Sequence, residues 1–164
     1  MLRTLTPACS RHATPRLLPA PQSVTVFSNY VEDSKGEGAA YDIAVIQLAE
    51  PIGDKTGWLG YRAQCTQPSP GPLKLTLAGY PNDAGPAGMG SPGGCLADTC
   101  TVDYSCGAIF NNHTCDSYVG QSGSGLYDDA YYVRMVHTLG VYQGQSQNGG
   151  ITMTPFMVGN IASW

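Results

Sequence analysis

The feature that most constrains the fold is the way glycine, proline, asparagine and aspartate break the chain into short apolar segments. The 164 residues include 21 glycines and 12 prolines, and no long stretch has the apolar period of a helix. Segments rich in β-branched and aromatic residues recur instead, which predicts an all-β sandwich or barrel. Only the end of the chain has the proline and the apolar side of a short helix. We expect strands at 23–31, 42–48 (more fully buried than the first), 73–79, 123–127, 132–138 and 150–154, an irregular loop at 81–94, and a helix at 155–164.

Composition and charge limit which kinds of partner the protein is expected to have. Charged residues make up 12% of the chain, the formal net charge is −4, and no basic patch is visible, so we expect no nucleic-acid partner. No apolar stretch approaches the roughly 20 residues that cross a bilayer, so we expect no membrane partner. No signal peptide is visible, although the acid-free residues 1–20 weakly resemble an organelle transit peptide.

Six cysteines, at positions 9, 65, 95, 100, 106 and 115, favour an extracellular or other oxidising compartment. Buried free thiols are the alternative, and the pairing stays open because six cysteines allow fifteen full connectivities. His113 lies within the cysteine cluster 95–115, which could suggest zinc. The spacings match no common zinc pair, so we expect no metal and no cofactor.

The sharpest local feature is a serine between glycines. In Gly120-Gln121-Ser122-Gly123-Ser124, the glycines permit a tight turn that exposes the hydroxyl of Ser122. They also allow backbone N–H groups to point at one spot, as an oxyanion hole requires. The segment alone is equally compatible with an ordinary glycine–serine loop.

Two further segments favour catalysis. Asp42 begins an apolar strand, where a carboxylate can orient a histidine and stabilise its imidazolium. His137 follows Ser122 by fifteen residues in the segment VHTLG. An aspartate followed about eighty residues later by a serine is the order of the chymotrypsin-type triad, in which a histidine comes first.

Five collinear segments together resemble the glutamyl endopeptidase branch of the trypsin-like serine proteases, over about residues 41–164. They are YDIAVIQL, GDKTGWLGYR, LAGYP, HTCDSYVGQSGSGLY and VHTLG, which begin at residues 41, 53, 77, 113 and 136. The resemblance implies a trypsin-like double β-barrel. Its parts would be an incomplete first barrel (1–52), a linker (53–70), a second barrel (71–154) and a short terminal helix (155–164).

The resemblance also implies roles. Ser122 would be the nucleophile of a serine endopeptidase acting on polypeptides, and Asp42 the orienting carboxylate. The N–H groups of Gly120 and Ser122 would form the oxyanion hole. His137 and Ser117 would line a pocket for an acidic side chain.

Two departures leave questions open. Asp116 lies six residues before Ser122, where trypsin holds its pocket aspartate, although an aspartate is also common there in the glutamyl branch. Basic specificity through Asp116 is therefore an alternative to acidic specificity. Gly125 stands where the family has a proline after Ser124, so the entry to the next strand is expected to be looser.

The histidine of the triad is missing from its expected place. Chain order excludes His113 and His137, and His12 lacks the Ala-His-Cys context of the family. We expect the sequence to be truncated at its N-terminus and this chain to hydrolyse peptides negligibly, because a serine without a base is a poor nucleophile. The alternatives are a catalytically dead peptide-binding module and a small disulfide-rich structural protein.

Overall fold

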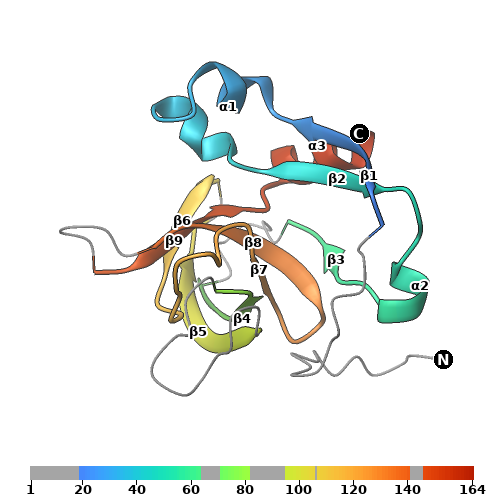
Figure 1. Ribbon diagram of the computed structural model, residues 1–164. Helices are drawn as coiled ribbons and strands as arrows, with labels where there is room; N and C mark the ends of the chain where they lie inside the picture. Colours follow the sequence, from blue (N-terminus) through green and yellow to red (C-terminus); the bar gives the residue numbers. More distant parts are fainter. Residues whose placement is uncertain (1–18, 64–70, 82–94, 106, 141–145) are drawn as a thin grey trace.

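The computed structural model describes residues 19–63, 71–81, 95–105, 107–140 and 146–164. Strands dominate these residues, and the helices are short (Figure 1). The all-β class expected from the sequence is confirmed. The expected loop at 81–94 lies almost entirely outside the described residues.

Six strands close into a barrel that fills the lower half of Figure 1. Around the barrel the order is β8-β7-β4-β5-β6-β9, and β9 pairs back onto β8. All of these pairings are antiparallel, and the short β3 (Gly60–Tyr61) joins β8 in parallel from outside. A barrel in this part of the chain was expected, and the structure has a closed barrel of six strands here. Its strands are β4 (Gly71–Gly79), β5 (Leu96–Tyr104), β6 (Phe110–His113), β7 (Gly125–Tyr127), β8 (Tyr132–Leu139) and β9 (Asn148–Thr152).

Alternation along the strands fills the barrel. In β4 the side chains of Leu75 and Leu77 point inward and are fully buried, while the residues between them are more exposed. β5 pairs with β4 along its whole length, which brings Cys100 opposite Leu75. The barrel core consists of Leu75, Leu77, Val102, Cys115, Leu126 and Met135.

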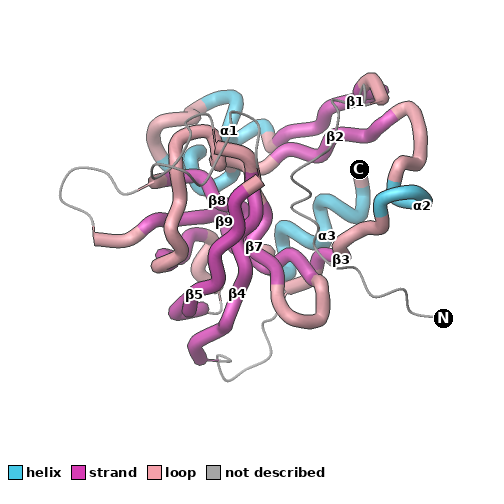
Figure 2. The backbone as a smooth tube through the Cα atoms, turned by 60° about the horizontal axis from the view of Figure 1, so that its bottom comes forward, coloured by secondary structure: helices cyan, strands magenta, loops and turns pink. Residues whose placement is uncertain are grey.

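A second apolar cluster holds the terminal helix and the N-terminal strands against the barrel. The helix α3 (Pro155–Ser163) was expected and is confirmed, and the side chain of Thr154 caps it by accepting a hydrogen bond from the N–H of Met157. The ring of Phe27 packs against those of Phe156 and Trp164. The cluster consists of Phe27, Ile43, Ile151, Met153 and Met157. In Figure 2 α3 lies between the barrel and the N-terminal strands.

The N-terminal strands form a two-stranded sheet from β1 (Pro21–Val26) and β2 (Ala44–Leu48). The prediction of one strand over 23–31 is wrong in its second half. The chain turns at Phe27, which enters the second cluster, and continues as α1 (Ser28–Glu32). The 3₁₀ helix η1 (Glu37–Tyr41) and the later helix α2 (Gly53–Thr56) complete the secondary structure.

The segment 42–48 is less exposed than 23–31, as expected, although its strand begins only at Ala44 and is not fully buried. Only Ile43 is buried, because β2 pairs with β1 alone among the described residues. One face of the ribbon is open, with Val24 at 59% and Ile46 at 57% exposure. No described helix combines the length and the apolar character that crossing a membrane requires.

Candidate active site

The loop that carries Ser122 is held by its neighbour Gln121. The side chain of Gln121 is buried, accepts a hydrogen bond from the N–H of Tyr118 (2.8 Å) and donates one to the carbonyl of Leu96 (3.4 Å). Gly120 and Gly123 have φ of 97° and 88°, which a residue with a Cβ rarely adopts. The result is a turn in which Gln121 points inward and Ser122 outward, and Ser122 is exposed.

Backbone hydrogen bonds fix this turn to β8. The N–H of Gly123 donates to the carbonyl of His137 (2.7 Å), and the N–H of His137 donates to the carbonyl of Ser124 (2.8 Å). The position of Ser122 relative to His137 is therefore set by main-chain geometry. Among the described residues no acceptor takes the N–H of Gly120 or of Ser122. These two donors are available to an oxygen atom beside Ser122, as in an oxyanion hole.

A cavity of about 490 Å³ opens beside Ser122. It collects five residues that the sequence singled out, since Asp116, Ser117, Gly120, Ser122 and His137 all line it. The backbone N–H of Asp116 donates to the carboxylate of Asp98 (2.8 Å), which anchors this part of the wall. Hydroxyl groups, imidazoles and the exposed Asp116 therefore line the cavity together with the serine.

Two imidazoles form the floor on one side. The Nε2 of His113 lies 3.0 Å from the Nδ1 of His137, and the two side chains are 1% and 2% exposed. Burial, together with the neighbouring His137 ring, lowers the pKa of His113 to about 4. Burial also lowers the pKa of His137, while the backbone of Gly149 acts in the opposite direction. Both rings are therefore neutral near pH 7.

A disulfide supports the same wall. Cys115 lines the cavity and is bonded to Cys100 on β5. Asn148 donates a hydrogen bond from its side chain to the carbonyl of Cys115 (2.6 Å). Cys95 is disulfide-bonded as well. The Cys100–Cys115 bond gives the cavity a covalently braced wall.

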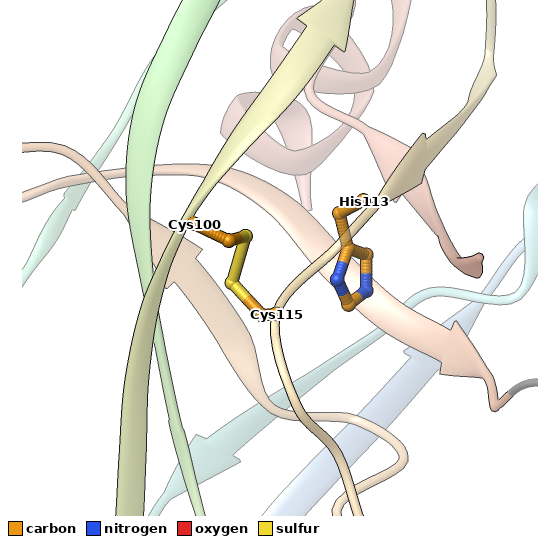
Figure 3. Close-up of side chains that lie close together, drawn as sticks. All are labelled: Cys100, His113 and Cys115. Carbon is orange, nitrogen blue, oxygen red and sulfur yellow. A yellow bond between two sulfur atoms is a disulfide. The ribbon is translucent and has the colours of Figure 1, made fainter.

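Within the part of the chain that the structure describes, three residues lie close enough together to be considered for zinc. Cys100, His113 and Cys115 could each offer a ligand atom, and these atoms lie within 4.8 Å of one another (Figure 3). A metal would need the cysteines as thiolates. Both sulfur atoms are instead consumed in the disulfide, so this group does not offer a metal site in its oxidised form.

Asp42 is not among the described residues that line the cavity with Ser122. It ends η1, two residues before β2, and is partly buried. No described contact links its carboxylate to that cavity. His12 falls outside the described residues. The two described histidines bond to each other and flank the cavity, rather than joining Asp42 to Ser122.

The structure adds three residues to the site that the sequence did not assign to it. Gln121 was part of the glycine–serine motif but had no role, and it holds the turn. His113 was considered for zinc and as a base, whereas it contacts His137 from β6. Asn148 gave no sequence signal, because it reaches Cys115 only through the pairing of β9 with β6.

Known proteins are similar to this chain in sequence and in fold. No protein-family model matches the chain. The glutamyl endopeptidase of Bacillus licheniformis is 32% identical over 134 residues, which make up 76% of this chain and 39% of that protein. A solved structure of Glu endopeptidase in complex with MPD has a TM-score of 0.68 at 26% identity, covering 87% of this chain and 62% of that one. The scabies mite inactivated protease paralogue S-I1 shares the fold alone, with a TM-score of 0.56 at 11% identity.

The chain thus spans well under half of the length of its curated relative and about three fifths of the solved Glu endopeptidase. By sequence and by fold, the chain is a glutamyl endopeptidase homologue with the fold of the chymotrypsin-type serine proteases.

Proposed function

We propose that this chain carries the nucleophile and the specificity pocket of a serine endopeptidase that cleaves after acidic residues. The observation that carries the proposal is one cavity shared by an exposed Ser122, the unpaired N–H groups of Gly120 and Ser122, and the imidazole of His137. In this mechanism Ser122 Oγ attacks the scissile carbonyl and forms an acyl-enzyme. The two N–H groups stabilise the negative charge on the carbonyl oxygen.

Acidic specificity follows from the donors in the cavity. His137 and Ser117 can each donate a hydrogen bond to a carboxylate of the substrate, and hydrogen bonds to a charged group are roughly twice as strong as neutral ones. Asp116 opposes this choice where its carboxylate faces the bound side chain. The backbone N–H of Asp116 donates a hydrogen bond to Asp98, which fixes the backbone of Asp116 but not its carboxylate.

Among the described residues, none has been assigned the transfer of the serine proton. A serine needs a base to take its proton, and Asp42 would orient that base. His113 and His137 are engaged with each other, so neither serves. We expect the 164-residue chain to cleave peptides negligibly, and a form extended by an Ala-His-Cys element to cleave them.

A catalytically inactive peptide-binding module is the second candidate. It is favoured by the same pairing of the two described histidines, which leaves the cavity formed but the serine without a described base. Such a module would bind acidic peptides without turnover.

A paired substrate assay on the extended form tests the proposal. Two peptides differing only in Glu or Arg before the scissile bond are compared, with Ser122→Ala as the inactive control and Ser124→Ala as the matched variant. We expect faster cleavage after Glu, abolished by Ser122→Ala alone. Faster cleavage after Arg would assign the pocket to Asp116, and equal activity of Ser122→Ala would reject the nucleophile.

A further inference from the structure

The pairing of His113 with His137 follows from the order of the strands. β9 lies between β6 and β8, so His113 is opposite Asn148 and His137 is opposite Gly150. These four positions share one face of the sheet, because residues two apart on a strand point the same way. Gly150 has no side chain, and a Cβ there would meet the carbonyl oxygen of Val136 and the side chain of Met135.

The contact is specific in its atoms. His113 uses Nε2 and His137 uses Nδ1, at 3.0 Å. The second nitrogen of each ring has a different environment. Nδ1 of His113 is buried and has no hydrogen-bond partner, whereas Nε2 of His137 is not among the buried side-chain atoms that lack a partner, and His137 lines the cavity. Figure 3 shows a ring nitrogen of His113 on the side of the disulfide, which accepts no hydrogen bond from it.

These environments select the direction of the hydrogen bond. Two neutral rings share a single proton at the contact. If His137 donated it, the second proton of the pair would sit on Nδ1 of His113, as a buried N–H with no acceptor. Buried N–H groups without an acceptor are rare, because nothing compensates the free energy that their removal from water costs. If His113 donates, no buried N–H is left unpaired, and the proton of His137 is on Nε2.

We infer that His113 is a positioning residue for specificity: it donates its Nε2–H to Nδ1 of His137 and so holds His137 in the tautomer that presents Nε2–H to the cavity. A carboxylate in the cavity then meets a donor without any protonation of the ring. The opposite tautomer would present a lone pair, which repels a carboxylate. The identity of the ligand rests on the proposed function, but the direction of the hydrogen bond does not.

The direct test reads the tautomers in the full 164-residue protein. Two-bond ¹H–¹⁵N correlation spectra at pH 7 distinguish a protonated from an unprotonated ring nitrogen in each histidine. We expect Nε2–H on both His113 and His137, with Nδ1 unprotonated on both. A spectrum in which His137 carries its proton on Nδ1 overturns the inference.

Variants of His113 test whether the tautomer of His137 determines the preference for an acidic side chain. His113→Gln keeps an amide N–H that can donate to His137, His113→Leu cannot donate, and Asn112→Leu on the same strand is the matched control. Each is titrated with acetyl-Ala-Ala-Glu and acetyl-Ala-Ala-Gln. We expect the preference for Glu to fall by about tenfold or more in His113→Leu and to persist in His113→Gln and Asn112→Leu.

The outcomes separate the two proposals. An unchanged preference for Glu in His113→Leu overturns the role of His113. No preference in the unmodified chain, together with the expected tautomers, rejects the proposed acidic pocket and leaves the hydrogen bond standing. If His113→Leu does not fold, the tautomers of the unmodified chain and of His113→Gln decide the matter.

Discussion

At the scale of the residue, the site is built from polar side chains whose partners are mostly backbone groups. Gln121 binds the N–H of Tyr118 and the carbonyl of Leu96, and Asn148 binds the carbonyl of Cys115. The histidine pair is the exception, because each ring depends on the other. Buried neutral imidazoles respond to pH, so this pair also links the site to stability.

His113 should make the protein sensitive to mild acid. The unfolded chain binds a proton at this ring below the ordinary pKa of 6.5, and the folded chain only below a pKa of about 4. Between these values the unfolded state binds more protons, so the free energy of unfolding falls as the pH is lowered. The difference between the two pKa values corresponds to about 3 kcal/mol.

Urea unfolding at pH 7 and pH 4.5 measures this effect. We expect the loss of stability between the two pH values to be smaller in His113→Gln than in the unmodified protein, with Asn112→Gln behaving like the unmodified protein. An identical pH dependence in all three would show that His113 is not the group responsible.

At the scale of the element, the β7–β8 hairpin is closed by a buried ion pair. The carboxylate of Asp128 accepts hydrogen bonds from the N–H groups of Ala130 and Tyr132 and from Nε of Arg134 (2.7 Å). Arg134 is 1% exposed. Burial alone would raise the pKa of Asp128, but the hydrogen bonds from Tyr132 and Arg134 lower it overall. The pair therefore holds β8, which carries His137, in register.

Removing this carboxylate should be costly. In Asp128→Asn the buried guanidinium of Arg134 loses its counter-charge, and we expect a loss of about 3–5 kcal/mol in the free energy of unfolding. Asp129→Asn, at the neighbouring exposed position, is the matched control and should change little. Chemical denaturation of both variants measures the difference, and equal small losses would mean that the pair contributes no more than a surface contact.

The elements also show where sequence was sufficient. β4 was predictable because its alternation of apolar side chains matches a half-buried strand. Residues 28–32 contain β-branched and aromatic side chains but form a helical turn, because Phe27 is drawn into a cluster with Trp164 at the far end of the chain. β5 and β6 were not predicted, and the cysteine pairing could not be, because both depend on register between distant strands.

Only part of the candidate site could likewise be predicted from the sequence. The motif around Ser122 and the position of His137 could be identified from the sequence, and in the structure both residues line one cavity. The contact of His113 with His137 could not be predicted from the sequence, because it depends on the pairing of β9 with both β6 and β8. The relation of Asp42 to Ser122 remains a prediction, since no described contact joins the two residues.

At the scale of the whole molecule, the barrel is closed but the β1–β2 ribbon is open on one face. Val24 and Val26 pair with Ile46 and Ala44, and all four point outward. Contiguous exposed apolar surface and free strand edges favour association. The face contrasts with the barrel, whose strands close on themselves.

This face should drive self-association of the isolated chain. We expect Val24→Lys combined with Ile46→Lys to reduce concentration-dependent association, because each lysine places a charge on the apolar face. Sedimentation velocity over a concentration series measures this, and Ala97→Lys on an exposed position of β5 is the control. Association that is equally strong in the double variant would place the contact elsewhere on the molecule.

The central claim is that Ser122 faces two N–H donors beside a pocket for an acidic side chain. Peptide boronic acids test it directly, because the boron forms a tetrahedral adduct with a serine oxygen and needs no turnover. We predict that the 164-residue chain binds a boronate with a glutamate side chain more tightly than one with an arginine side chain. The ¹¹B signal of the adduct should disappear in Ser122→Ala and persist in Ser124→Ala. Tighter binding of the arginine analogue, or an adduct that survives Ser122→Ala, would contradict the account.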